Sequence, residues 1–333
     1  MKYFAKTFFY LVVLSLVLSS CTQDDDTRTQ DDDTSTLGFE DVTWEEWPNT
    51  DCSTSTSPLR DILAYKLLGI PYHWSINPIN MGTYEIYANL NVKELSSYPL
   101  DFRRKNQRNG THGAYMNLLK GEADLIIASR DISRNEKDSA AALGVELLTT
   151  PLATDALVFI VNPKNPVNNL TTEQLQKIYT GEITNWKEVG GVDHAITPFI
   201  RDADSGSQEK METMVMKGLT MLDESSTWVM KGSSMFSPYS CIAHDEYAIG
   251  YSPYFYCTSM VRDLIEVKMI SIDGVKPNKK SLKENSYPFT SYIYAAVRKS
   301  EPHESMAYRL FQYLYTKEGA KIVNESGYID IGE

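Results

Sequence analysis

The sequence predicts an α/β fold with two domains. Short apolar runs alternate with amphipathic stretches along the chain, which is the pattern of βα units rather than of a β-sandwich or a helical bundle. About 290 residues remain after a low-complexity N-terminal segment, and a single hydrophobic core rarely grows that large. The sequence contains no internal repeat. We therefore expect two domains, each with strands buried against helices.

The N-terminus has the pattern of a signal peptide over residues 1–20. Lys2 and Lys6 precede an apolar run at 8–18, and small residues lead to Cys21. The run is shorter than the ~20 residues of a spanning helix and is followed by acidic residues, so no transmembrane helix is predicted. Cys21 resembles the lipid-carrying cysteine of bacterial lipoproteins, with ordinary secretion as the alternative.

Residues 21–47 predict a lipidated cysteine followed by an acidic tether. Asp triplets at 24–26 and 31–33 lie among Thr, Gln and Ser, with almost nothing that could be buried. A segment of this composition stays disordered and would hold the folded part away from a membrane. The expected location is therefore outside the cytoplasm, anchored by lipid to the cell envelope, on the periplasmic side or at the cell surface.

Composition and charge restrict the function classes. Hydrophobic residues make up 42% of the chain, as in globular proteins, and the net charge is −12. Nucleic acid is not an expected partner, because binding its phosphate backbone needs clustered Lys and Arg. A small anionic ligand would instead need a few donors placed locally.

The remaining cysteines do not form a metal-binding pattern. Cys52, Cys241 and Cys257 are an odd number, with no CxxC pair and no nearby His pair. Neither a zinc site nor a disulfide framework is predicted, and we expect no metal and no cofactor. Cys241 and Cys257 could form a disulfide in an oxidising compartment or remain buried thiols, and the sequence leaves both possibilities open.

Three apolar runs predict buried strands, and four N-terminal signals predict helices. The strands are expected at 124–128, 156–161 and 292–297. The first helix is expected to begin with Ser57 as cap and Pro58 in first position, and the second with Thr111 as cap. The third is expected to begin with a capping box of Thr171 and Gln174, and the fourth to begin within residues 205–208. Gly69, Gly121, Gly181 and Gly218 follow the last turns of these helices.

Three of these helix starts lie in polar loops suited to an anion, at 53–57, 109–112 and 201–207. Free N–H groups and the positive end of the helix dipole face whatever occupies such a loop. Ser and Thr hydroxyls add neutral donors, and Arg201 offers a planar fork that can hold two oxygens of a tetrahedral anion. Each Ser or Thr alone could simply cap its own helix. Three such loops, one with an Arg, favour an oxyanion site.

A long ungapped segment also resembles a known family. Residues 170–191 contain Thr171-Thr172-Glu173-Gln174-Leu175 and then Thr180-Gly181-Glu182-Ile183-Thr184-Asn185-Trp186. They resemble the signature of the phosphate-binding proteins that feed the high-affinity phosphate ABC importer. Residues 51–56 resemble this family's first anion loop, 123–130 its strand ending in a ligand-facing Ser or Asp, and 201–207 its Arg-x-x-x-Ser-Gly-Ser/Thr loop. The similarity covers about residues 48 to 333.

The resemblance implies the type II fold of periplasmic binding proteins, with two crossover segments and the ligand in an interdomain cleft. Domain I would comprise residues 48–153 and 293–333, and domain II residues 154–292. The implied function is capture of phosphate, or a similar tetrahedral oxyanion, by hinge closure without chemistry, so the protein is not expected to be an enzyme. The implied partners are the anion, an ABC permease in the inner membrane and, through the lipid, the membrane.

Matching the family's motifs position by position assigns a set of ligand-binding residues to the two domains. Domain I would contribute Ser53, Thr54, Ser55, Thr56, Thr111 and Ser129. Domain II would contribute Arg201, Ser205, Gly206 and Ser207. Within the signature itself, Ile178 and Trp186 are expected in the core rather than at the ligand.

Two residues depart from the family pattern. Cys52 stands where a Gly is usual, so the first loop is expected either to avoid positive φ or to carry strain. Ser129 stands where some relatives carry an Asp that accepts the proton of hydrogen phosphate and repels sulfate. Discrimination would then fall to Asp51, Asp124 or Asp204, and the sequence does not choose among them.

Two other function classes stay open. A phosphate-ester hydrolase would need an activated nucleophile or a metal cluster, and the sequence shows no G-x-S-x-G elbow or pair of metal ligands. His112 is accordingly expected to be an exposed residue beside a helix cap. A surface adhesion or sensor protein could reuse the fold. Tyr247, Tyr251, Tyr254 and Tyr256 are expected to pack beneath the cleft edge rather than to stack on a sugar.

Overall fold

The computed structural model describes residues 39, 42–79, 82–89, 100–226 and 229–331. The predicted signal peptide, Cys21 and both Asp triplets lie outside the described residues. None of the described helices combines the length and the hydrophobicity that a membrane span requires. Phe39 and Trp47, which fall in the predicted tether, are buried, so the folded part begins before residue 48. The Trp47 indole donates to Asn106 Oδ1 at 3.2 Å, which ties this segment to the domain.

One nine-stranded sheet runs through the molecule, in the order β1-β4-β12-β5-β9-β7-β8, with β10 and β13 also paired to β5. The strands are β1 (Thr50–Cys52), β4 (Leu125–Ala128), β12 (Thr290–Arg298), β5 (Leu147–Val161), β9 (Ala248–Pro253), β7 (Thr197–Arg201), β8 (Met230–Gly232), β10 (Lys268–Met269) and β13 (Ile329–Asp330). The three predicted strands are confirmed as β4, β5 and β12. The predicted α/β class is therefore confirmed.

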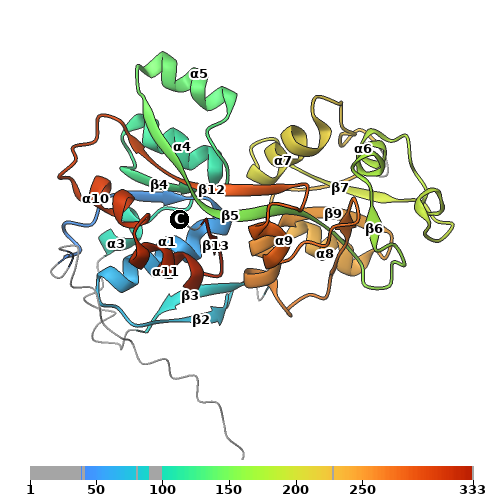
Figure 1. The fold of residues 1–333 in the computed structure, drawn as a ribbon, viewed down its shortest axis with the longest axis horizontal. Helices are drawn as coiled ribbons and strands as arrows, with labels where there is room; N and C mark the ends of the chain where they lie inside the picture. The colour runs from blue at the N-terminus through green and yellow to red at the C-terminus, as the bar shows by residue number, and fades with distance from the viewer. Residues whose placement is uncertain (1–38, 40–41, 80–81, 90–99, 227–228, 332–333) are drawn as a thin grey trace, which may run out of the picture.

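Strands β5 and β12 pair antiparallel from Ala156 opposite Thr290 to Leu147 opposite Arg298, with an irregularity after Ile293. Figure 1 shows two lobes side by side, and these two strands run through both. We call the lobe with β1 and β4 lobe 1, and the lobe with β7 and β9 lobe 2. The predicted domain boundaries, near residues 153 and 293, fall inside the two shared strands and stay a prediction.

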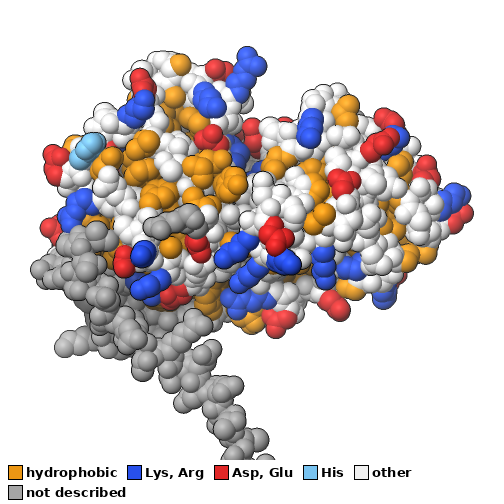
Figure 2. Space-filling model, in the orientation of Figure 1, with side chains coloured by type: hydrophobic (Ala, Val, Ile, Leu, Met, Phe, Trp, Pro, Cys, Tyr) orange, Lys and Arg blue, Asp and Glu red, His pale blue; other side chains and the backbone are white. Residues whose placement is uncertain are grey.

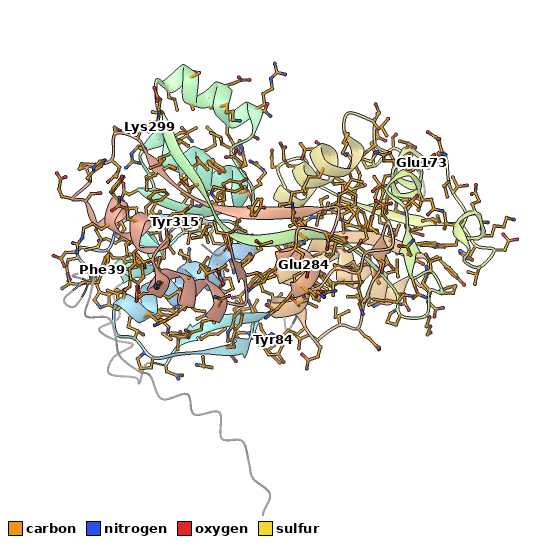
Figure 3. All side chains as sticks on the ribbon, in the orientation of Figure 1. Phe39, Tyr84, Glu173, Glu284, Lys299 and Tyr315 are labelled. Carbon is orange, nitrogen blue, oxygen red and sulfur yellow. The ribbon has the colours of Figure 1, made fainter. Side chains whose placement is uncertain are left out.

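Lobe 1 carries most of the longer helices and a separate hairpin. Its elements are η1 (Thr54–Thr56), α1 (Ser57–Leu67), α3 (Leu100–Lys105), α4 (Gly110–Lys120), α5 (Arg134–Leu143), α10 (Met306–Tyr313), α11 (Lys317–Glu325) and the hairpin β2 (Tyr72–Ile76) and β3 (Tyr84–Ala88). Figure 3 labels Tyr315, between α10 and α11, whose hydroxyl donates to the Thr150 carbonyl of β5 at 2.8 Å. The connection between α10 and α11 is thus tied to the long strand.

Lobe 2 is built from shorter elements. They are α6 (Thr172–Thr180), η2 (Trp186–Val189), α7 (Gly206–Lys210), the π-helix η3 (Met211–Met216), α8 (Ser237–His244), the π-helix η4 (Tyr256–Val261), α9 (Lys279–Lys283), and the pair β6 (Asn169–Leu170) and β11 (Ser271–Ile272). Figure 2 shows a notch between the lobes at the upper edge. There, residues 130–133 face 209–214 across a cavity of about 340 Å³.

The predicted helix boundaries are confirmed in lobe 2 more closely than in lobe 1. Thr171 and Gln174 form the predicted capping box, and Gly181 ends α6 with φ of 84°. The predictions that Ser57 caps α1 and that Thr111 caps α4 are both wrong, because Thr56 and Asn109 occupy the two cap positions. Ile178 and Trp186 are fully buried, which confirms their place in the core.

All three described cysteines are free and buried. The open question about Cys241 and Cys257 is therefore answered in favour of two separate thiols. Burial raises the pKa of each of these two thiols to about 11. Both remain protonated and unreactive in the folded protein.

Candidate functional site

A cavity of about 640 Å³ lies between the lobes, where loops that start α1, α4 and α7 meet the ends of β4 and β7. All of the predicted site residues except Thr56 line it. Loops more than 140 residues apart in the sequence, from Ser53 to Ser207, therefore meet at one place. This is the position expected for a ligand in an open α/β sheet, beyond the carboxyl ends of the strands.

Three hydroxyls form the lobe 1 wall. Ser53 Oγ lies 2.8 Å from Thr111 Oγ1, and Thr111 Oγ1 lies 2.9 Å from Ser129 Oγ. The Ser129 backbone N–H donates to Ser53 Oγ at 2.8 Å, and all three residues are buried. Two hydroxyl-to-hydroxyl bonds use two of the three O–H protons, so one O–H stays available to a ligand. The wall is thus held in place before any ligand arrives.

Thr56 belongs to the scaffold of the first loop. Its hydroxyl donates to the Ile127 carbonyl at 2.7 Å and to the Ser53 carbonyl at 3.1 Å, so it points away from the cavity. Thr54 and Ser55 do line the cavity. They lie at the start of η1 and α1, where the first N–H groups of a helix have no partner within the helix.

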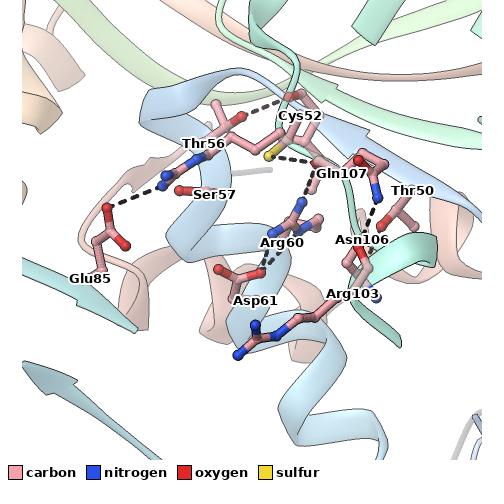
Figure 4. A network of polar contacts seen from close by, with 12 residues as sticks. Thr50, Cys52, Thr56, Ser57, Arg60, Asp61, Glu85, Arg103, Asn106 and Gln107 are labelled. Atoms are coloured by element: carbon pink, nitrogen blue, oxygen red, sulfur yellow. Dashed lines mark hydrogen bonds and ion pairs between the residues drawn. The ribbon is translucent and has the colours of Figure 1, made fainter. Parts of the chain in front are cut away.

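Cys52, which replaces the usual Gly, causes no strain. It is the last residue of β1, pairs with Ile127 and is absent from the residues with positive φ. Figure 4 shows its surroundings behind the loop, where Cys52 Sγ lies 3.6 Å from the Gln107 carbonyl and Arg60 donates to that same carbonyl. Burial raises the pKa of Cys52 to about 12. The first loop therefore avoids positive φ, which was one of the two outcomes expected for it.

Arg201 dominates the lobe 2 wall. The residue is 5% exposed, its Nε donates to the Gly232 carbonyl at 3.0 Å and one terminal nitrogen donates to the Ser233 carbonyl at 2.8 Å. The other terminal nitrogen lies 3.2 Å from the sulfur of Met235. Among the described residues no carboxylate forms an ion pair with this guanidinium, and burial lowers the pKa of Arg201. A buried cation held only by neutral groups is unfavourable until an anion joins it.

The serines beside Arg201 also lack partners of their own. Ser205 Oγ is buried without a hydrogen-bond partner among the described residues, and Ser207 Oγ has only a 3.8 Å contact to the Met235 sulfur. A buried hydroxyl without a partner is rare in folded proteins and points to a missing group. Arg201, Ser205 and Ser207 therefore present unmet donors to the cavity.

Gly206 brings the two walls together. A Cβ on this residue would lie 2.6 Å from Ser129 Oγ and 2.7 Å from Thr111 Oγ1, closer than side chains approach. Only glycine permits this contact between the start of α7 and the hydroxyls of lobe 1. The structure therefore has the lobes closed on one another at this point.

The sequence matches the family model for the PBP superfamily domain over residues 93–318. The chain belongs to the PBP superfamily. A relative in this superfamily, the phosphate-binding protein PstS of Borreliella burgdorferi, is 26% identical over 225 residues, which is 67% of this chain and 76% of that protein.

Two solved structures share the fold. One is a putative phosphate ABC transporter substrate-binding protein with bound phosphate from Clostridium perfringens, with a TM-score of 0.62, 24% identity, and 85% and 98% of the two chains covered. The other is an ABC-type phosphate transport receptor from Vibrio cholerae, with a TM-score of 0.59, 25% identity, and 84% and 98% covered. The predicted type II periplasmic-binding-protein fold and the resemblance to phosphate-binding proteins are thereby confirmed.

The three candidate acids differ in what they contact in this PBP-superfamily chain. Asp51 accepts from Asn109 and Asn117 side chains at 2.8 and 2.7 Å, and Asp124 pairs with Arg298 at 2.7 Å. Both carboxylates are thus occupied in holding loops. Asp204 alone of the three lines the cavity, on its exposed side.

A buried ion pair that the sequence did not reveal supports the lobe 1 wall. Arg130 forms two hydrogen bonds of 2.8 Å with Glu136, whose side chain is fully buried. His112 Nδ1 lies 3.1 Å from the same carboxylate, and the His112 side chain is 40% exposed. Arg130 thus pairs below the surface rather than on it, and it fixes the segment after Ser129.

One of the four tyrosines predicted to pack beneath the cleft edge contacts the site residues directly. Tyr251 is fully buried, and its hydroxyl accepts from the Arg201 backbone N–H at 3.1 Å and donates to Gln208. Tyr247, Tyr251, Tyr254 and Tyr256 do not line the cavity. Tyr251 therefore supports the loop that carries Arg201, whereas Tyr247 stacks on His194 with ring centres 3.4 Å apart.

Further lining residues were not predicted. Ser233, Ser234 and Met235 follow β8 and hold or flank the Arg201 guanidinium, and Pro253 ends β9. A Gly-Ser-Ser run at 232–234 is another small-residue loop, and this signal could have identified the segment. Within the ranges that the structure describes, no group of three or more His, Cys, Asp or Glu side chains could hold a metal ion.

Proposed function

We propose that this protein captures inorganic phosphate between its lobes and delivers it to the membrane permease of an ABC importer, without chemistry. The observation that carries the proposal is the buried Arg201 guanidinium, whose partners among the described residues are all neutral. A tetrahedral oxyanion would supply the missing negative charge and accept the fork geometry of the guanidinium. The names of the relatives, phosphate-binding and phosphate-transport proteins, favour phosphate among such anions.

Each wall has a distinct part in this proposal. Arg201, Ser205 and Ser207 would donate charge-assisted and neutral hydrogen bonds from lobe 2. Thr54 and Ser55 would donate backbone N–H groups from lobe 1, where the helix dipole also favours an anion. The hydroxyl wall would offer one O–H and, at its other end, lone pairs that accept the proton of hydrogen phosphate.

Binding and release would follow from movement of the lobes about β5 and β12. The close contact of Gly206 with the hydroxyl wall joins the two lobes beside the cavity, and we infer that the lobes separate to load the anion. Closure on ligand would then bury the anion away from competing water. Domain I at 48–153 and 293–333 and domain II at 154–292 would be the moving units.

The N-terminal pattern completes the proposal. Residues 1–20 would direct export, and a lipid on Cys21 would anchor the protein to the cell envelope, facing the periplasm or the cell surface. The acidic segment after Cys21 would let the folded part reach a permease in the inner membrane. Mass spectrometry of the protein purified from membranes tests this step, and an N-terminus without lipid at Cys21 contradicts it.

Titration calorimetry with native mass spectrometry tests the proposed ligand. The purified protein is titrated with phosphate, sulfate, arsenate, molybdate and a neutral sugar at constant ionic strength. We expect one phosphate per chain and weaker or no sulfate binding. Binding of none of the oxyanions would refute the proposal, and tighter binding of another oxyanion would replace phosphate as the ligand.

A further inference from the structure

A second contact between the lobes lies away from the anion cavity. The guanidinium carbon of Arg262, at the end of η4 in lobe 2, lies 4.7 Å from the ring centre of Trp74 and 4.6 Å from that of Tyr84, both in lobe 1. Figure 3 labels Tyr84 at the lower edge, where the hairpin β2–β3 reaches lobe 2. The described residues offer Arg262 no ion pair with a carboxylate, so these two rings are its main partners across the gap.

The hairpin presents the two rings on one face. Trp74 pairs with Ile86 and Tyr84 with Ile76, so Trp74 and Tyr84 are diagonal neighbours on the same side of the two strands. A cation between two aromatic faces is attracted by both ring quadrupoles. The contact therefore depends on a cationic side chain at position 262 and on the strand register that places both rings on one face of the hairpin.

The backbone at Arg262 is strained. Its φ is 48° and its ψ is −115°, a conformation that residues with a side chain rarely adopt. Such strain persists only where surrounding contacts hold it, and it often marks a functional position. Here the conformation directs the side chain of a residue that ends a π-helix toward the opposite lobe.

The hairpin also touches the segment that holds Arg201. A Cβ on Gly82, in the hairpin loop, would lie 2.6 Å from the Phe236 ring, so the loop backbone rests directly on that ring. Phe236 follows Met235, whose sulfur contacts the Arg201 guanidinium at 3.2 Å. The hairpin is thus connected, through one residue, to the lobe 2 wall of the anion cavity.

We propose that Arg262, Trp74 and Tyr84 form an interlobe clamp that raises phosphate affinity by favouring the closed arrangement, without touching the anion. This proposal rests on the proposed function, in which the lobes open and close. Separation of the lobes would pull Arg262 out from between the rings, so the clamp adds to the stability of the closed state alone. Apparent affinity rises in proportion to the fraction of molecules that are closed.

Arg262→Gln tests the clamp, with Arg309→Gln as its matched control. Arg309 lies 4.9 Å from the Phe39 ring within lobe 1 and bridges no gap. Arg262→Gln should weaken phosphate binding about fivefold to tenfold, as expected for the loss of one or two cation–π contacts, while Arg309→Gln should leave it unchanged. Arg262→Lys, which retains a cation, should recover most of the affinity.

Solution scattering without ligand gives a second measurement that does not depend on phosphate. Arg262→Gln and Trp74→Leu should each increase the radius of gyration of the ligand-free protein, and the double variant should add little to either. Arg262→Gly should do the same while relieving the backbone strain, so its unfolding midpoint should not fall. Unchanged affinity and unchanged radius in these variants would overturn the clamp. A changed radius in a protein that binds no phosphate would uphold the clamp and refute the proposed function.

Discussion

The two walls of the cavity differ in how their polar groups are satisfied. On lobe 1, Ser53, Thr111 and Ser129 bond to one another, and the nearby Arg130 is paired with a buried carboxylate. On lobe 2, Arg201 has no anionic partner among the described residues, and Ser205 Oγ has no partner among them at all. The three hydroxyls of lobe 1 are therefore mostly bonded to one another, whereas lobe 2 carries unmet donors that an anion would satisfy.

Because of this difference, one wall mainly sets the geometry of the site and the other mainly supplies the free energy of anion binding. A wall whose groups are already bonded keeps its geometry and gains little from a ligand, because each new bond replaces an old one. A wall with a buried cation gains the most free energy from an anion, because the cation was already removed from water when the protein folded. We therefore expect most of the affinity to come from lobe 2 and the arrangement of the site from lobe 1.

Replacing Arg201 should have the largest effect. Arg201→Met should weaken phosphate binding by about 3 kcal/mol, more than a hundredfold, because Arg201 is the one Lys or Arg among the described residues that line the cavity. The free energy of unfolding without ligand should stay constant or rise, since an uncompensated charge is removed. Calorimetry and urea unfolding measure the two quantities. An affinity close to that of the unaltered protein would remove Arg201 from the site.

Glu136→Gln tests the paired charge of lobe 1. Burial opposes ionisation of Glu136, but hydrogen bonds and charge from Arg130 outweigh it and hold the pKa of Glu136 below its usual 4.5. The carboxylate therefore stabilises the fold above that pH, and the contribution is lost as pH falls through the lowered pKa. We expect the variant to lose about 2 kcal/mol of unfolding free energy at pH 7, and less below pH 4.

Urea unfolding across this pH range measures the loss in Glu136→Gln. Glu146→Gln is the matched control, because Glu146 pairs with Lys299 on the surface with its side chain 74% exposed. That control should show no measurable change in stability. A constant deficit in Glu136→Gln at all pH values would contradict an ionised, paired carboxylate.

Ser205→Ala should separate affinity from stability on lobe 2. Phosphate binding should weaken by about 1.5 kcal/mol, roughly tenfold, because a hydrogen bond to a charged ligand is lost. Stability without ligand should not fall, since the hydroxyl has no partner among the described residues. Loss of stability equal to the loss of affinity would show that this hydroxyl is already bonded in the ligand-free protein.

Ser129→Ala should show the opposite balance on lobe 1, with the smallest effect on affinity. Removing the hydroxyl breaks its 2.9 Å contact with Thr111 and should lower the unfolding free energy by about 1 kcal/mol. Phosphate affinity should fall less than in Ser205→Ala, because the wall keeps two of its three hydroxyls. A larger loss of affinity in Ser129→Ala than in Ser205→Ala would reverse the assignment of the two walls.

Local signals in the sequence were sufficient for much of the fold. The capping box of Thr171 and Gln174, the glycine that ends α6 and the apolar runs of β4, β5 and β12 depend on neighbours within a few residues. Helix starts in small polar loops also identified the anion loops, because unpaired N–H groups at a helix start are a local property. The sequence by itself therefore determined these elements and most of the cavity-lining residues.

The role of each polar residue was decided only by tertiary structure. Thr56 and Thr111 looked alike in sequence, yet Thr56 bonds to two carbonyls of the scaffold and Thr111 joins Ser53 and Ser129 in the cavity wall. A Ser or Thr hydroxyl can cap a helix, hold a loop in place or bind a ligand, and its role depends on which atoms lie within about 3 Å of it. The same holds for the two arginines. Arg130 follows a strand and Arg201 ends one, but Arg130 is paired with the Glu136 carboxylate, whereas Arg201 has no carboxylate partner among the described residues.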